Sequence, residues 1–266
     1  MIFRSCRFGL IALLMMSLAA CATSPTGRKQ LMLVSEDQAI EYSRQAYIDT
    51  VADLSKEGKL VTDPAVIRRV QTITDHLVEQ AGVMRPVTRN WQWEVKVIDE
   101  PEQVNAWCMA GGKMAVYTGL IQKLNITNDE LAQVMGHEIS HALANHTAER
   151  MSVAMATSLG LGVISVVSDK PEQAVAMGAV AATLAIQLPN SRTSESEADR
   201  IGIELAAKAG YDPRAAVTLW QKMDQVNSGH PPEFLSTHPS PDNRQEELRK
   251  LAEQMMPYYE QARAKR

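Results

Sequence analysis

The stretch Gly136-His137-Glu138-Ile139-Ser140-His141 determines how the rest of this chain is interpreted. It lies in a segment with apolar residues at helical spacing, and residues four apart on a helix share a face. His137 and His141 can therefore direct two imidazoles at one metal ion. Glu138 lies about 100° further round the helix and can reach a water on that ion as a general base. The alternative is a pair of surface histidines beside an ordinary glutamate.

A catalytic metal site of this kind needs a third protein ligand. One common pattern has a glycine three residues and a histidine six residues after His141, but Ala144 and Thr147 occupy these positions. Another has a glutamate about twenty residues further on, but no acidic residue lies between 151 and 167. Glu149 would lie on the same helix at roughly 12 Å, which is too far to share the ion.

The remaining candidates are Glu195 and Asp199 at the start of a predicted helix over residues 194–210. They are four residues apart and share a face, whereas Glu197 points elsewhere. Glu195 can complete a His-His-Glu site, and Asp199 can hydrogen-bond a ligand imidazole from behind. Taken alone, such a pair more often marks an acidic helix start.

Composition limits the class of protein. The 266 residues are 45% hydrophobic and 22% charged, which suits one globular domain. The formal net charge is −4 and no basic patch interleaved with aromatic residues occurs, so we expect no nucleic-acid partner. Aromatic residues make up only 5% of the chain, whereas methionine and alanine are frequent, which favours helix.

The N-terminal region has the features of a bacterial lipoprotein signal. Arg4 and Arg7 precede an apolar run over residues 8–18 that is too short to span a bilayer comfortably. The run ends in Leu18-Ala19-Ala20-Cys21, which resembles a lipobox, so we predict lipidation of Cys21 and a lipid anchor in the membrane. Ala22 after the cysteine favours the outer membrane. The alternative is an ordinary signal peptide with an incidental cysteine.

The pattern of the remaining chain predicts an α+β, mainly helical fold. Caps and apolar spacing predict helices over residues 35–56, 64–82 and 128–150, in addition to 194–210. Strands are predicted over 91–97, 104–109 and 113–117, with a turn at Gly111-Gly112 between the last two. We expect them to form a small antiparallel sheet beside the motif helix.

Two apolar runs follow that helix, over residues 151–167 and 174–188, and Pro171 lies between them. Each is shorter than the roughly 20 residues of a membrane-spanning helix. We therefore predict a helical hairpin packed on the domain. The functional alternative is a flap over the active site or a segment that dips into the bilayer surface.

His137-Glu138-x-x-His141 followed by Glu195-x-x-x-Asp199 resembles the membrane-associated zinc metallopeptidases that include HtpX, the CAAX prenyl protease and the periplasmic lipoproteins LoiP and BepA. The resemblance extends from about residue 26 to Arg244. It includes Asn105-Ala106-Trp107, Gly111-Gly112, Tyr117-Thr118-Gly119-Leu120, Ala209-Gly210-Tyr211-Asp212-Pro213 and Thr237-His238-Pro239. The lipobox indicates the LoiP and BepA type. Trp107-Cys108-Met109-Ala110 departs from the commoner residues, which leaves the substrate preference open.

This resemblance implies a zincin-like fold and one Zn²⁺ per chain, on the ligands His137, His141 and Glu195. It also implies that Asn105 and Ala106 form the edge of the cleft and bind an extended substrate by strand addition. The alternative for that strand is an ordinary place in the core.

The resemblance further implies that His238 and Arg244 approach the zinc. They would stabilise the oxyanion, or His238 would occupy the open zinc position and hold the enzyme latent. From sequence alone, a loop histidine before a proline is more often unremarkable. Of the other histidines, we interpret His76 and His146 as helix-surface residues and His230 as part of a loop.

The predicted organisation is a lipoprotein signal peptide (1–20), a lipidated Cys and tether (21–35), a zinc metallopeptidase domain (36–250) and a C-terminal helical tail (251–266). The predicted function is hydrolysis of misfolded or misassembled envelope proteins by a lipid-anchored zinc metalloendopeptidase. We expect it in the bacterial envelope, at the outer membrane facing the periplasm, with the outer-membrane assembly machinery as a possible partner. The alternatives are a chaperone-like assembly lipoprotein that cleaves rarely and a structural lipoprotein with an accidental motif.

Overall fold

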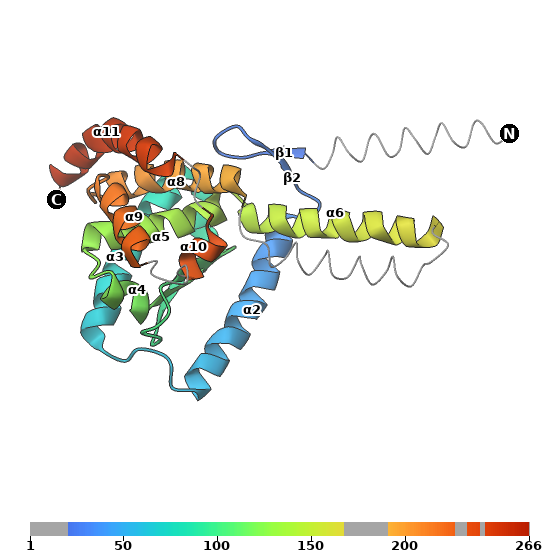
Figure 1. Cartoon of the computed structure of the whole chain (residues 1–266), viewed down its shortest axis with the longest axis horizontal. Helices are drawn as coiled ribbons and strands as arrows, with labels where there is room; N and C mark the ends of the chain where they lie inside the picture. The colour runs from blue at the N-terminus through green and yellow to red at the C-terminus, as the bar shows by residue number, and fades with distance from the viewer. Residues whose placement is uncertain (1–20, 168–190, 227–232, 240–242, 266) are drawn as a thin grey trace. The chain divides into compact units, whose positions relative to one another are not determined.

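The computed structural model describes residues 21–167, 191–226, 233–239 and 243–265 (Figure 1). Its helices are α2 (Glu36–Lys56), α3 (Pro64–Met84), α4 (Thr118–Lys123), α5 (Asn128–Leu143), α6 (His146–Val167), α8 (Arg192–Lys208), α9 (Ala215–Val226), α10 (Glu233–Thr237) and α11 (Arg244–Arg263), with a 3-10 turn at Pro86–Asn90. Its strands are β1 (Cys21–Thr23), β2 (Lys29–Leu31), β3 (Glu94–Ile98), β4 (Ala106–Met109) and β5 (Lys113–Tyr117). The chain divides into two compact units, Met1–Ala39 with Thr147–Leu188 and Ile40–His146 with Pro189–Arg266.

Helix α5 is the centre of the second unit. It contacts α3, α8, α9 and strand β4, and all of its residues from Glu130 to Leu143 are buried. The helix begins with a capping box, in which the Thr127 hydroxyl accepts from the Glu130 amide and the Glu130 carboxylate accepts from the Thr127 amide. A helix buried on every face is fixed by its neighbours, so the motif residues of α5 have a rigid support.

Helices α5 and α8 approach each other closely at Gly136 and Gly202. A Cβ atom added to Gly202 would lie 2.8 Å from the His137 amide nitrogen and 2.9 Å from its Cα. A Cβ atom added to Gly136 would lie 2.9 Å from the Gly202 carbonyl oxygen. Glycine is therefore needed at both positions because each contact is with backbone, which cannot move aside as a side chain can.

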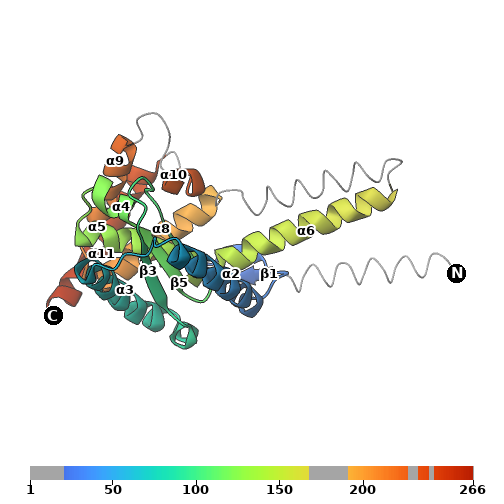
Figure 2. The ribbon, with the colours of Figure 1, turned by 90° about the horizontal axis from the view of Figure 1, so that it is seen from below.

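The three-stranded sheet has the strand order β3-β5-β4. Strands β4 and β5 form the predicted antiparallel hairpin, closed by Gly111 and Gly112 at φ +82° and +85°. The pairing of β3 with β5 is parallel, so the prediction of a wholly antiparallel sheet is wrong in this detail. Alternation along a strand predicts which face is buried but not the direction of its neighbour. Helices α3 and α5 pack against each other, α3 on β3 and α5 on β4 (Figure 2).

The mainly helical α+β class is confirmed, and local signals located several elements closely. Asp63 caps α3 by accepting a hydrogen bond from the Ala65 amide at 2.8 Å, with Pro64 in the first turn. The expected domain end at residue 250 lies inside α11, whose Leu248 and Ala252 are both buried.

The predicted continuous motif helix over residues 128–150 is wrong. Helix α5 ends at Leu143, and Asn145 adopts a left-handed conformation with φ +56° before α6 begins at His146. Asparagine tolerates this conformation better than most residues, so it can end a helix as glycine does. The side chain of His146 consequently does not lie where a continuous helix would place it.

In the first unit, β1 and β2 pair as an antiparallel hairpin within the predicted tether. Arg28, beside β2, binds Glu149 of α6 through two hydrogen bonds of 2.6 Å, which fits the exclusion of Glu149 as a metal ligand. The first helix of the predicted apolar hairpin is the later part of α6, whereas the second, over 174–188, lies outside the described residues. Among the helices that the structure describes, none is long and apolar enough to cross a membrane.

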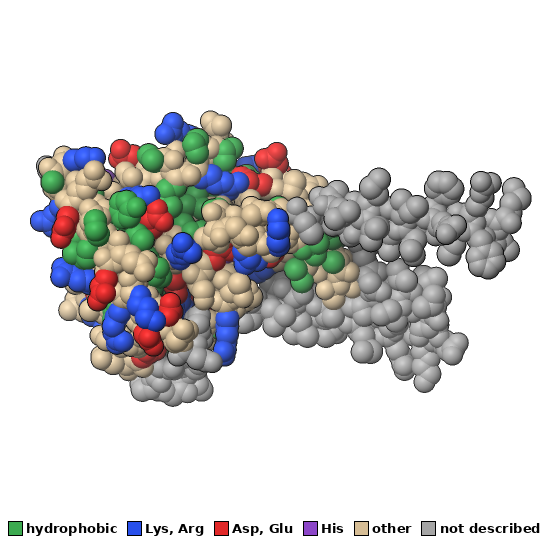
Figure 3. Space-filling model, turned by 90° about the horizontal axis from the view of Figure 1, so that it is seen from above, with side chains coloured by type: hydrophobic (Ala, Val, Ile, Leu, Met, Phe, Trp, Pro, Cys, Tyr) green, Lys and Arg blue, Asp and Glu red, His purple; other side chains and the backbone are tan. Residues whose placement is uncertain are grey.

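Charged side chains of both signs are interspersed on the face of the molecule shown in Figure 3. Several large hydrophobic side chains, such as Tyr42, Ile48, Val83 and Tyr258, are exposed singly along the helices. Scattered exposed apolar residues are normal for a globular surface and need no special explanation. Charged side chains are seldom fully buried, so the residues that call for an explanation are the buried charged ones.

We predict that Gly202→Ala destabilises the fold. Contact of the new methyl group with backbone costs about 1–3 kcal/mol, partly offset by about 0.5–1 kcal/mol of improved helix propensity. The expected fall in melting temperature is about 2–8 °C, measured by circular dichroism. The control is Gly82→Ala on α3, whose Cβ would meet only the flexible side chain of Arg89. Equal melting temperatures of Gly202→Ala and the wild type would contradict the close approach.

Candidate metal centre

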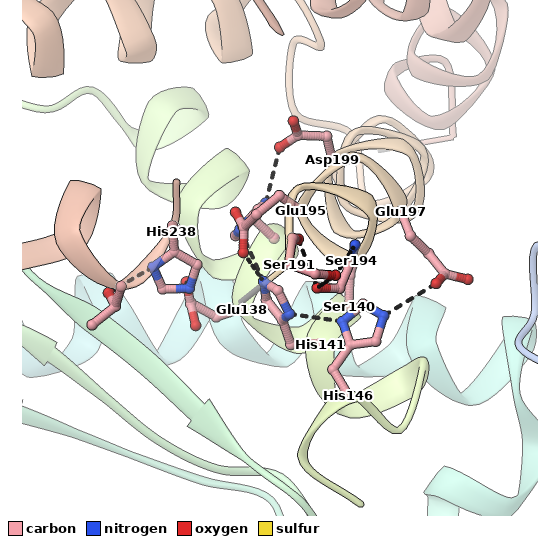
Figure 4. A network of polar contacts seen from close by, with 12 residues as sticks. Glu138, Ser140, His141, His146, Ser191, Ser194, Glu195, Glu197, Asp199 and His238 are labelled. Carbon is pink, nitrogen blue, oxygen red and sulfur yellow. Dashed lines mark hydrogen bonds and ion pairs between the residues drawn. The ribbon is translucent and has the colours of Figure 1, made fainter. Parts of the chain in front are cut away.

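The residues predicted as metal ligands lie together at the contact of α5 and α8. The Nε2 atoms of His137 and His141, both on α5, are 3.1 Å apart. Glu195 extends from the first turn of α8, with Oε2 3.3 Å from His137 Nε2 and Oε1 3.4 Å from His141 Nε2. All three side chains are buried. Figure 4 shows Glu195 of α8 directed toward His141 of α5.

Asp199 lies one turn further along α8, behind His137. Its Oδ1 atom is 3.0 Å from His137 Nδ1 and accepts a hydrogen bond of 2.6 Å from Arg244 Nη2. The guanidinium of Arg244 lies over the ring of Trp220, with Cζ 3.4 Å from the ring centroid. The predicted contact of Asp199 with a ligand imidazole is thus present, and Arg244 acts on that imidazole through Asp199.

His238 completes the cluster from the loop after α10. Its Nδ1 atom is 3.1 Å from the Phe234 carbonyl oxygen, and its ring stacks on Phe234 with centroids 4.4 Å apart. Its Nε2 atom is 3.3 Å from Glu138 Oε1. His137, His141, Glu195 and His238 each offer one ligand atom, and these atoms all lie within 4.8 Å of one another.

The hydrogen bonds made by the Nδ1 atoms indicate which ring nitrogen carries the proton and which carries the lone pair. A carboxylate or carbonyl oxygen can only accept, so the Nδ1 atoms of His137 and His238 carry the protons that they share with Asp199 and Phe234. In the neutral imidazoles, the lone pair on Nε2 of His137 then faces the carboxylate of Glu195, and the lone pair on Nε2 of His238 lies beside Glu138. The fully buried Oε1 atom of Glu195 accepts no hydrogen bond from the described residues. Converging lone pairs beside a buried carboxylate suit a divalent cation of the zinc type.

Sequence comparison agrees with this geometry. A model of peptidase family M48 matches residues 64–252. The chain belongs to peptidase family M48. The family predicted from the motifs is thereby confirmed.

Three relatives illustrate the match. The mitochondrial metalloendopeptidase OMA1 of Bos taurus is 34% identical over 242 residues, which cover 87% of this chain and 46% of the relative. The mitochondrial metalloendopeptidase OMA1 of Arabidopsis thaliana is 35% identical over 207 residues, covering 74% of this chain and 38% of the relative. The beta-barrel assembly-enhancing protease of Escherichia coli (strain K12) is 30% identical over 216 residues, covering 78% of this chain and 43% of the relative. The chain spans less than half the length of these curated relatives.

Burial and neighbouring charges determine the protonation states of His137, His238 and Asp199 in the metal-free form. Burial lowers the pKa of His137, but the Asp199 and Glu195 carboxylates outweigh it and raise this pKa to about 9. Burial lowers the pKa of His238 to about 4. Burial raises the pKa of Asp199, but Arg244 and His137 lower it more strongly, so this carboxyl is ionised at neutral pH. In the metal-free form, a proton on His137 therefore occupies the place that an ion would take.

Two residues outside the predicted ligand set, His146 and Glu197, belong to the same network. His146, predicted on a helix surface, is buried, and its Nδ1 atom lies 2.8 Å from His141 Nδ1. Its Nε2 atom lies 3.1 Å from Oε2 of Glu197, which is also buried. The helix break at Asn145 brings His146 back to the site. Asparagine is one of the residues that can end a helix in a left-handed conformation, so Asn145 was the sequence signal for this break.

The other histidines lie elsewhere. His76 is partly exposed on α3, in agreement with its prediction as a helix-surface residue, and its Nδ1 atom is 2.9 Å from the hydroxyl of Tyr211. The loop prediction for His230 lies outside the described residues.

Asn105 and Ala106 lie at the start of β4, an outer strand of the sheet. The Asn105 carbonyl accepts from the Tyr117 amide, and Ala106 pairs with Val116, both on the inner side toward β5. No strand among the described residues pairs with the outer side of β4, and β4 contacts α5. The segment therefore has an available edge next to the helix that carries the motif.

We predict that metal binding to this centre weakens as the pH falls. Below its pKa of about 9, His137 must lose a proton before its nitrogen can bind the ion. Apparent zinc affinity should therefore fall by roughly tenfold per pH unit between pH 8.5 and 6.5, with release of about one proton. Calorimetry in buffers of different ionisation enthalpy measures both quantities.

The matched variant for this measurement is Asp199→Asn, which removes one of the carboxylates that raise the pKa of His137. It should release fewer protons per ion than the wild type at the same pH. Zinc affinity that is constant over this pH range would contradict the protonation state described for His137.

Proposed function

We propose that this chain is a zinc-dependent metalloendopeptidase in which His137, His141 and Glu195 hold the ion. The convergence of imidazole Nε2 atoms on a buried carboxylate supports this proposal most directly. Zinc held there would act as a Lewis acid, which brings the pKa of water toward about 7 and polarises a peptide carbonyl. The ligand types favour zinc over magnesium or calcium, which prefer oxygen ligands.

Glu138 is the general base of the proposed reaction. It follows His137 on α5, and its carboxylate is buried beside the ligands. In this role it accepts a proton from the attacking water and delivers it to the leaving amine.

Asp199 and Arg244 have positioning roles in this proposal. Asp199 accepts the Nδ1 proton of His137, which leaves Nε2 free for the ion. Arg244 binds Asp199 at 2.6 Å and lies 3.5 Å from Glu195 Oε2, so it balances the charge of two buried acids. All of these contacts use Nη2, whereas Nε and Nη1 make no hydrogen bond with the described residues, so the predicted part of Arg244 in stabilising an oxyanion stays a prediction.

The outer side of β4 is the proposed substrate site. An extended peptide can add to Asn105 and Ala106 as a further strand, because main-chain hydrogen bonding is independent of side-chain sequence. The contact of β4 with α5 supports this assignment, since it would hold the scissile bond near the motif helix. An enzyme that binds mainly through backbone suits unfolded proteins as substrates.

His238 holds the enzyme latent in this conformation. Its Nε2 atom lies among the three proposed ligands, and four protein ligands fill the tetrahedral set that zinc prefers. Activation would then require the loop that carries His238 to withdraw and give its place to water. The oxyanion role would instead need His238 close to the substrate.

We predict that His238→Ala increases hydrolysis of an unfolded protein such as casein, because it vacates the fourth position. Peptide release over time measures the effect, with zinc content determined in parallel. The control is Ser236→Ala, an exposed position on the same short helix that keeps the imidazole and its contacts. A loss of activity in His238→Ala at full zinc content would instead favour the oxyanion role.

We predict that Glu138→Gln retains zinc but reduces casein cleavage by about 10²–10⁴-fold, the usual contribution of a general base. The comparison is made in the wild-type and His238→Ala backgrounds, so that latency does not hide the loss. Glu253→Gln, an exposed position on α11, is the control for the same chemical change. Full activity of Glu138→Gln would rule out this residue as the base.

We further propose that the enzyme is a lipoprotein anchored through Cys21 in the bacterial envelope, at the outer membrane facing the periplasm. The lipobox at residues 18–21 supports this location. The Escherichia coli relative is named for β-barrel assembly, which supports misassembled envelope proteins as substrates and their assembly machinery as a partner. The relatives named mitochondrial share the peptidase family but not this location, so the location depends on the N-terminal signal.

A further inference from the structure

His146 and Glu197 form a buried pair that the proposed ligand set leaves unexplained. The side chain of His146 is 1% exposed and that of Glu197 is 3% exposed. Burying two ionisable groups is unfavourable unless each is hydrogen-bonded, so such a pair is rarely retained without a use. A contact of 2.8 Å between His146 Nδ1 and His141 Nδ1 links the pair to the centre of the site.

The three residues admit one consistent placement of protons when His141 binds a metal. The Glu197 carboxylate only accepts, so the proton between it and His146 lies on His146 Nε2. A neutral His146 then has its lone pair on Nδ1 and accepts a proton from His141 Nδ1. The lone pair of His141 is thereby directed to Nε2, which is the atom that faces Glu195.

Helix α8 thus reaches both histidines of the motif. Asp199 contacts His137 directly, whereas Glu197 contacts His141 through His146. Figure 4 shows Glu195 and Glu197 on opposite flanks of α8, with Glu197 directed to His146.

We propose that His146 and Glu197 are positioning residues that fix the tautomer and ring orientation of His141 as a metal ligand. The proposal rests on the metal site proposed above. A ligand imidazole held on its far nitrogen is more basic and loses less freedom on binding. The break at Asn145 is part of this arrangement, because it returns His146 to His141 five residues after that ligand.

The test uses the full chain and the metal alone. His146→Leu removes the acceptor and should weaken zinc binding about 10–100-fold in chelator competition, as loss of such a contact usually does. Asparagine places its carbonyl oxygen near the position of histidine Nδ1, so His146→Asn should stay within about threefold of the wild type. Glu197→Leu, at the other end of the relay, should weaken binding in the same direction as His146→Leu.

Cobalt substitution gives a second readout that a loss of stability alone would not change. The visible absorption of bound Co²⁺ should shift in His146→Leu and Glu197→Leu, because the orientation of one ligand ring changes. The matched control is His76→Leu, which removes a partly buried histidine bonded to Tyr211 on α3 and should leave the affinity and the spectrum unchanged. Melting curves of the metal-free variants identify those that fold.

The outcomes separate this proposal from the one on which it rests. A wild-type chain that binds no zinc refutes the metal site itself. A wild-type chain that binds zinc, with folded His146→Leu and Glu197→Leu variants of equal affinity and unchanged cobalt spectrum, overturns the relay alone. Equal losses in the Asn and Leu variants of His146 also overturn it, because the acceptor would then be irrelevant.

Discussion

The close approach of α5 and α8 at Gly136 and Gly202 is the constraint on which the site depends. Gly136 precedes His137, and Gly202 lies two turns after Glu195 on the same face of α8, with Asp199 between them. Backbone contact at this point fixes the separation of the two helices. The distances from Glu195 to the imidazoles then follow from side-chain length alone. Larger residues at the crossing would move the two halves of the ligand set apart.

The buried negative charge of the site favours a bound cation. Four carboxylates are buried at the site, on Glu138, Glu195, Glu197 and Asp199, and the buried guanidinium of Arg244 contacts two of them, those of Glu195 and Asp199. Uncompensated buried charge is far more costly than buried apolar surface is favourable, so the excess must be offset within the site. A proton on His137 does this in part, consistent with its raised pKa. A divalent ion does so more completely and also occupies the converging lone pairs.

Sequence reasoning succeeded where the signal is local or is a spacing on one helix. The cap at Asp63, the strand over residues 113–117 and the common face of Glu195 and Asp199 required only helical or strand periodicity. It failed for the direction of β3 and for His146. Both depend on where the chain turns, at a strand crossover in one case and at Asn145 in the other. One residue in a left-handed conformation redirects all that follows it, and periodicity carries no information about such a point.

The same reasoning explains why the site is built from several distant segments. Each imidazole of the cluster is held from behind by a different part of the second unit. His137 is held by Asp199 on α8, His141 by the residue after the helix break, and His238 by the Phe234 carbonyl of α10. If any one of these elements moves, the imidazole that it holds is no longer oriented toward the centre of the site. Helix α10 is the shortest of these supports, with five residues, so the imidazole that depends on it can withdraw at the lowest cost to the fold. In the proposed function, His238 is therefore the ligand that can leave, and the two motif histidines are the fixed part of the centre.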